Sequence, residues 1–187
     1  MISFNELEKG KRIIIDGFPW EILEASHMVK GRGQSVIQGR LKNLKNGNII
    51  SKTFRSSDSF KEADIKKLKA TFLYKNNKNV YFFCKEGNPK DRFFIEEDKL
   101  GSISKFLKEG SLVEGIIFED EIINISLPVK INLKVIEAPP GIKGDRAQSG
   151  TKPIKLETGA EILAPLFIKE GDIVEINTEK EEYSKRL

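Results

Sequence analysis

The sequence has few of the side chains that build metal centres and disulfide scaffolds. Its 187 residues include one cysteine, Cys84, and one histidine, His27. A single cysteine cannot form an internal disulfide, and one histidine leaves no histidine cluster to hold a metal ion. Zinc sites and disulfide-rich scaffolds are therefore excluded, and a lone thiol fits a reducing compartment.

Long apolar segments are also missing. The first twelve residues, MISFNELEKGKR, contain no apolar run of the kind that a signal peptide needs. No stretch approaches the roughly 18 apolar residues of a membrane-spanning helix. With 39% hydrophobic and 32% charged residues, the chain is too apolar to be disordered and too polar to be membranous. We expect a globular, cytoplasmic protein with no membrane partner.

The usual motifs of nucleotide binding and catalysis are absent too. The segment at residues 144–152 (GDRAQSGTK) looks like a phosphate-binding loop, but its two glycines are one residue too far apart and its threonine precedes its lysine. No serine or cysteine has a nucleophile signature around it. His27, beside a loop, fits a packing or hydrogen-bonding role better than that of a general base. We therefore expect no enzyme, no metal and no cofactor.

Positive charge is concentrated in the first third of the chain. Residues 1–63 hold 11 basic and 7 acidic side chains, residues 64–128 hold 11 of each, and residues 129–187 hold 10 of each. Between Glu24 and Asp58 there is no carboxylate. Cations without local counter-ions attract phosphate, although a merely solvated basic strand face is the alternative. The cations of this window are Lys30, Arg32, Arg40, Lys42, Lys45, Lys52 and Arg55.

Strand patterns dominate the chain. Short β-branched or aromatic runs, separated by turn residues, occupy residues 12–16, 20–23, 35–44, 48–54, 71–74 and 80–84. Asn46-Gly47 and Asn76-Asn77 each predict a two-residue hairpin turn, which needs positive φ at both positions. Helical pattern is limited to short pieces at residues 64–69 and 103–109. The sequence thus predicts an all-β protein.

A short internal repeat suggests three modules. Residues 108–114 (KEGSLVE) recur 61 residues later as residues 169–175 (KEGDIVE), each a glycine turn that leads into a strand. Any β protein can reuse such a turn, but the offset also suits modules of about 60 residues. We expect three small closed barrels, each of about five strands. Their predicted ranges are 1–63, 64–128 and 129–187.

A glycine-flanked loop carries the most informative candidate site. Glycines on both sides of Arg32 permit a tight, exposed excursion between two strands, with the guanidinium at its tip. Such a group suits phosphate or RNA and is badly suited to burial, whereas the alternative is a hairpin tip without a role. The loop site comprises Lys30, Gly31, Arg32, Gly33 and Gln34.

Several ordered motifs resemble those of the bacterial translation elongation factor P family. They are residues 27–34, 41–47 (LKNLKNG), 52–55 (KTFR), 155–160 (KLETGA) and 176–178 (INT), with Pro165, Phe167, Ile168, Gly171, Asp172, Tyr183 and Arg186. The resemblance covers essentially the full chain. It implies an SH3-like (KOW-type) barrel followed by two OB-fold barrels, in an L-shaped, tRNA-like arrangement.

The resemblance also implies a function without bond chemistry. Family members bind the 70S ribosome beside prolyl peptidyl-tRNA and help peptide bonds form at consecutive prolines. By this match, Arg32 enters the peptidyl-transferase centre and the loop of Gly144, Asp145 and Arg146 lies near messenger RNA in the exit site. The residues expected to grip the tRNA and rRNA backbone are Arg40, Lys42, Lys45, Lys52 and Arg55. A monomer is expected.

The loop departs from the family pattern in ways that bear on modification. A lysine-like extension needs an amine, which Arg32 lacks, and arginine-tipped relatives carry rhamnose instead. The resemblance therefore implies covalent rhamnose on Arg32, added by an arginine-modifying glycosyltransferase. Lys30 stands where proline is usual, Val29 where lysine is usual, and Arg146 where threonine is usual. A general single-stranded RNA-binding or chaperone protein, or a specialised paralogue, are the alternative functions.

Overall fold

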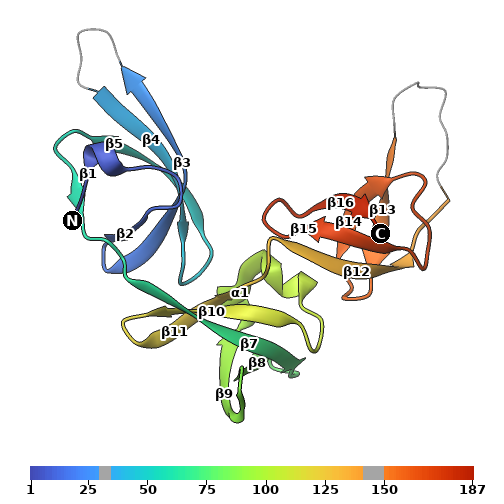
Figure 1. The fold of residues 1–187 in the computed structure, drawn as a ribbon. Coiled ribbons are helices and arrows are strands. Elements are labelled where there is room, and N and C mark those ends of the chain that lie inside the picture. Colours follow the sequence, from blue (N-terminus) through green and yellow to red (C-terminus); the bar gives the residue numbers. More distant parts are fainter. Residues whose placement is uncertain (30–34, 141–149) are drawn as a thin grey trace. The chain divides into compact units, whose positions relative to one another are not determined.

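The computed structural model describes residues 1–29, 35–140 and 150–187, and it is built almost entirely of β-strands (Figure 1). The prediction of an all-β protein made of small barrels is confirmed, since its sheets are small and curled. Its tRNA-like arrangement stays a prediction. In the part of the chain that the structure describes, no helix combines the length and the apolar character that crossing a bilayer requires.

The N-terminal sheet has the strand order β2-β3-β4-β5. Its inner face buries Ile13, Ile22, Ile37, Leu41 and Phe54 completely, which removes the apolar half of each alternating strand from water. A two-stranded ribbon, β1-β6, and the short 3-10 helix η1 accompany it. The bounds are β1 Ile2–Ser3, η1 Phe4–Glu6, β2 Arg12–Ile15, β3 Phe18–Val29, β4 Ser35–Asn43, β5 Ile49–Arg55 and β6 Ser59–Phe60.

The central sheet has the order β11-β10-β7-β8-β9. The helical piece predicted at residues 64–69 is wrong, because residues 65–69 belong to strand β7. Leu68 of this strand packs closely on Gly115, where an added Cβ would lie 2.9 Å from the Leu68 side chain. The bounds are β7 Ile65–Lys75, β8 Val80–Lys85, β9 Asn88–Glu96, α1 Glu97–Leu100, η2 Gly101–Phe106, β10 Leu112–Phe118 and β11 Glu121–Ser126. The 3-10 helix η2 covers part of the other helical prediction, at residues 103–109.

The C-terminal sheet has the order β14-β13-β12-β15-β16. Its core buries Val135, Leu156, Ile168, Val174 and Ile176 completely. The bounds are β12 Lys130–Glu137, β13 Thr151–Leu156, β14 Glu161–Pro165, β15 Ile173–Asn177 and β16 Glu182–Arg186.

Phe106, at the end of η2, is a member of this C-terminal core and is only 1% exposed. Lysines on both sides of Phe106 in the sequence form ion pairs. Lys105 pairs with Glu181, and the Lys108 ammonium lies 2.9 Å from the Glu157 carboxylate. Hydrogen bonds from Lys105 and Ser102 lower the pKa of Glu181. Partial burial would raise the pKa of Glu157, but hydrogen bonds from Lys108 and the Lys134 amide outweigh it and lower that pKa. The η2 segment is thus fastened to the C-terminal core.

The chain divides into two compact units by its internal contacts. One holds residues 1–69, 95–101 and 115–125, and the other holds residues 70–94, 102–114 and 126–187. Phe106 and its flanking ion pairs explain why residues 102–114 group with the C-terminal sheet. The three-module division at residues 63 and 128 stays a prediction.

Both predicted hairpins form, but their turns are longer than two residues. The Asn43 amide N–H donates a hydrogen bond of 2.8 Å to the Asn48 carbonyl and closes the β4–β5 turn. Only Gly47 of the predicted pair has positive φ. The Asn43 side chain accepts hydrogen bonds from the amides of Lys45 and Asn46. In the β7–β8 turn, Asn76 and Val80 close the loop and Asn79 takes the positive φ. Asparagine side chains that bond to the following backbone therefore decide the turn type.

The internal repeat is a structural motif, and it occurs three times among the residues that the structure describes. Gly110 and Gly171 have φ of +81° and +89°, and their amides donate to the carbonyls of Phe72 and Val135, both at 2.9 Å. The third copy is Gly10, with φ of +88°, whose amide donates to the Ile22 carbonyl at 2.8 Å. In each copy a second hydrogen bond runs the other way. The residue whose carbonyl accepts from the glycine donates its own amide N–H to the carbonyl of the residue after the glycine. One bend therefore leads into β2, β10 and β15 alike.

Gly171→Ala is expected to destabilise the protein by about 1–2 kcal/mol, since an L-residue is strained at this φ. Nothing lies within 4 Å of the added Cβ, so the loss is conformational rather than a clash. Urea unfolding would measure it. Glu170→Ala, an exposed change in the same turn, is the matched control and should stay within about 0.5 kcal/mol of the parent. Equal stabilities of the two variants would contradict the prediction.

Candidate nucleic-acid interface

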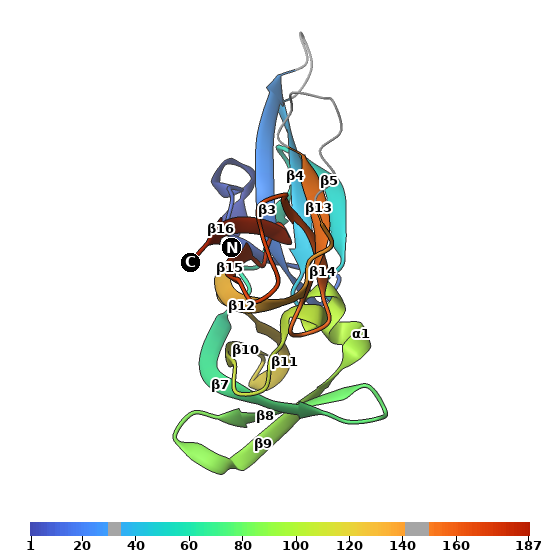
Figure 2. The same ribbon diagram turned by 90° about the vertical axis from the view of Figure 1, so that its right-hand side faces the viewer.

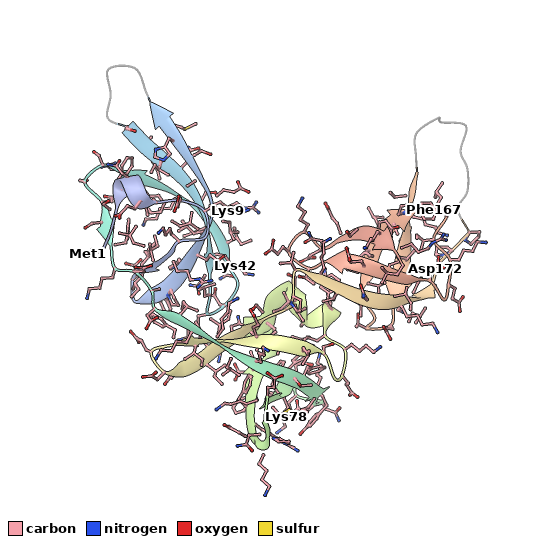
Figure 3. The ribbon with its side chains drawn as sticks, viewed as in Figure 1. Met1, Lys9, Lys42, Lys78, Phe167 and Asp172 are labelled. Atoms are coloured by element: carbon pink, nitrogen blue, oxygen red, sulfur yellow. The ribbon has the colours of Figure 1, made fainter. Side chains whose placement is uncertain are left out.

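Three of the predicted backbone-contacting cations share the outer face of the N-terminal sheet. On β4, Ile37, Gly39 and Leu41 are buried, so Arg40 and Lys42, which alternate with them, belong to the other face. Lys42 is labelled in Figure 3. The antiparallel register pairs Arg40 with Ser51, Lys42 with Ile49 and Val36 with Arg55. Residues directly opposite one another share a face. Arg40, Lys42 and Arg55 therefore present their charges to the same side.

The other two predicted contacts lie elsewhere. Lys52 pairs with Gly39, on the inner face with Phe54, and is half-buried there. Glycine is required at position 39, because a Cβ would come within 2.7 Å of the Phe54 ring. Lys45 lies in the β4–β5 turn, with its ammonium 5.4 Å from the centre of the Phe18 ring. A surface that binds through Arg40 thus reaches Lys45 only at the end of the sheet and does not include Lys52.

The window free of carboxylates in the sequence is not free of them in space. Strand β3 runs antiparallel to β4 and brings Glu24 opposite Arg40 and Glu21 opposite Lys42. A guanidinium nitrogen of Arg40 lies 3.6 Å from the Glu24 carboxylate, and both side chains are exposed. Exposed pairs of this kind contribute about 0–1 kcal/mol, so a phosphate can replace the carboxylate. The missed signal was the register of the β3–β4 hairpin.

His27 takes the packing role that the sequence favoured. Its ring lies edge-to-face against the buried Phe4 ring, with centroids 6.2 Å apart. It stands opposite Ile37 in the β3–β4 ladder, near the end at which Val29 pairs with Ser35. Within the described ranges, no three His, Cys, Asp or Glu side chains gather in a way that could hold a metal ion.

Two of the predicted sites lie outside the described residues. One is the tip loop, which comprises Lys30, Gly31, Arg32, Gly33 and Gln34. The other is the exit-site loop with Gly144, Asp145 and Arg146. The structure gives the strands before and after the tip loop, β3 and β4, and these pair up to Val29 and Ser35. The roles of both loops therefore stay predictions from sequence.

Known proteins match this chain along its whole length. The family model "Elongation factor P (EF-P) KOW-like domain" matches residues 3–60, and "Elongation factor P, C-terminal" matches residues 131–186. Relatives named "Elongation factor P" from Endomicrobium trichonymphae and Dictyoglomus turgidum are 41% and 40% identical over 186 residues, covering 100% of this chain and 100% of each relative. A solved structure of "Eukaryotic translation initiation factor 5A from Methanococcus jannaschii" is also similar, with a TM-score of 0.49 and 16% identity over 68% of this chain and 90% of that one.

Proposed function

Because this chain belongs to the elongation factor P family of translation factors, we propose that it binds the ribosome beside peptidyl-tRNA and promotes peptide-bond formation at consecutive prolines. The observation that carries the proposal is the relationship over the full chain, which includes the segment around Arg32. Its place of action is the cytoplasm, where ribosomes work.

The geometry of proline explains why the reactants need to be positioned at such a stall. Its ring fixes φ and restricts the residue before it, so the donor and acceptor of the reaction are badly placed. Holding reactants in the right geometry can lower a barrier by several kcal/mol without any new bond chemistry. In this proposal the factor supplies orientation, and the ribosomal RNA supplies the reaction site. The protein itself breaks and forms no bond.

Arg32 is the residue proposed to act at the CCA end of the peptidyl-tRNA. A guanidinium stays protonated and presents a planar set of donors that suits phosphate and ribose oxygens. The rhamnose expected on Arg32, the glycosyltransferase that would add it, and the messenger-RNA contact of Gly144, Asp145 and Arg146 remain predictions.

The outer face of the N-terminal sheet supports a revised set of backbone contacts. We assign Arg40, Lys42 and Arg55 to one tRNA phosphate track, because their register places them on one face. Lys45 extends this set at the β4–β5 turn. Lys52 is left out, since it lies on the opposite face. Such contacts fix orientation without reading sequence, which suits a factor that accepts tRNA by its backbone and shape.

The test is a toeprinting assay in a purified translation system that lacks any other factor of this family. Added protein should weaken the stall on a message with consecutive proline codons and leave a control message without them unchanged. Material purified from the native host preserves any modification. A stall that persists at saturating protein would count against the proposal, as would equal effects on both messages.

A further inference from the structure

Three aromatic rings form a row across the outer face of the central sheet. They come from β7, β8 and β9, which are neighbouring strands of this sheet (Figure 2). Tyr74 lies on β7, Phe82 on β8 and Phe94 on β9. The Tyr74 and Phe82 rings stack with centroids 4.9 Å apart, and the Phe82 and Phe94 rings are 6.2 Å apart. Tyr74 is 41% exposed and Phe94 is 62% exposed, with the half-buried Phe82 between them.

This row is not needed to fill the core. The opposite face of the same strands carries its own aromatic cluster, in which Phe83 lies 5.5 Å from Phe72 and 5.2 Å from Phe93, centroid to centroid. Phe72 and Phe83 are buried there. Neighbouring exposed rings leave apolar surface in contact with water, and such patches commonly mark binding sites. The outer row is therefore a candidate binding surface.

Cations stand beside the exposed end of the row. Alternation along β9 puts Lys90 and Arg92 on the face of Phe94, and both side chains are exposed. The Arg92 guanidinium makes a long hydrogen bond of 3.5 Å to the Pro89 carbonyl of its own strand. The adjacent Asp91 belongs to the other face, where it pairs with Lys85 at 2.7 Å. Positive charge therefore accompanies the rings on the outer face.

We propose that this platform, formed by Tyr74, Phe82, Phe94, Lys90 and Arg92, binds single-stranded RNA. Unpaired bases stack on the exposed rings of Tyr74 and Phe94, and the Phe82 ring packs between these two rings. Lys90 and Arg92 contact the RNA backbone. Every base has a π-face, so stacking tolerates any sequence, and cations contribute the attraction to phosphate. Charge favours RNA over an apolar protein partner. The platform is a separate site and does not rest on the function proposed above.

The experiment measures fluorescence anisotropy of a short, unstructured RNA at low ionic strength, without ribosomes. Phe94→Ala should weaken binding about tenfold or more, the effect of losing one stacked base. The matched control is Phe167→Ala, which removes a ring of similar exposure, 56%, labelled in Figure 3. The Arg186 guanidinium lies 5.6 Å from the centre of this ring. It should change binding less than twofold. Arg92→Gln should reduce the slope of log affinity against log salt by about 0.7.

A photo-crosslink locates the bound RNA. An oligonucleotide carrying 4-thiouridine should crosslink to peptides that contain β8 or β9. Unchanged binding by Phe94→Ala, or crosslinks confined to other segments, would overturn the proposal. Melting curves of both phenylalanine variants show that the fold is kept, which is expected because both rings are largely exposed. Since no ribosome is present, failure here leaves the toeprinting result unaffected.

Discussion

Arg32→Ala is expected to abolish the relief of stalling at consecutive prolines while the protein stays folded. The proposed action depends on one positioned guanidinium, and alanine removes all its donors. The neighbouring strands β3 and β4 keep their own ladder from Glu24 with Arg40 to Val29 with Ser35. Substitutions away from packed or hydrogen-bonded features usually change stability by less than about 0.5 kcal/mol. Activity and stability should therefore separate.

Toeprinting and thermal melting of the same samples would check this. Intact-protein mass spectrometry comes first, because it shows whether Arg32 of the parent protein carries added mass. Arg32→Lys keeps the charge but loses the planar set of donors, so it should restore little activity. Arg40→Ala is the matched control, because Arg40 lies on β4, the strand that follows this loop, and already has Glu24 as a partner. It should cost only part of the activity. Full activity of Arg32→Ala, or a large fall in its melting temperature, would refute the role.

Phe106→Ala should have the largest effect on stability, about 3–5 kcal/mol, because it leaves a cavity in a core that relaxes only partly. The side chain is 1% exposed and packs among the residues of the C-terminal sheet. The Lys105 ammonium lies 5.1 Å from the ring centre, so the ring also supports the ion pair with Glu181. Removing it weakens both the core and the fastening of η2.

Urea unfolding of this variant beside Phe167→Ala makes the measurement specific. Both changes remove a phenyl ring, but Phe167 is exposed, so its loss should cost far less. A fragment of residues 129–187 lacks Phe106 and should be unstable. A fragment of residues 101–187 retains Phe106 and should be the more stable of the two. A loss below about 1 kcal/mol for Phe106→Ala would show that the C-terminal core does not depend on this ring.

The strands and hairpins could be predicted because their signals are local. Alternating apolar residues and turn residues fall within a few positions of one another, so Asn46-Gly47 and Asn76-Asn77 located two hairpins. The turn geometry could not be read in the same way, since the Asn43 side chain bonds two amides of the following turn. Residues 64–69 misled the prediction because Leu68 packs on Gly115, far away in the sequence.

The candidate site was harder, because faces depend on register. Composition located the cations of residues 40–55, but only strand pairing shows that Lys52 faces away from Arg40 and that Glu24 faces toward it. The aromatic row was overlooked for the same reason. Period-two alternation in β8 and β9 could have placed Phe82 and Phe94 on outer faces, yet their adjacency follows from the sheet order. Likewise, nothing near Phe106 in the sequence reveals its place in the C-terminal core.

The thrice-used glycine bend gives the molecule room to evolve. Each bend makes its bonds through the backbone, to Ile22, Phe72 and Val135, and demands little of the side chains around it beyond the glycine. The outward-facing side chains of one sheet can therefore change during evolution without disturbing the bend that leads into β2, β10 or β15. The cations on the outer face of the N-terminal sheet and the aromatic row on the central sheet are two examples of such change.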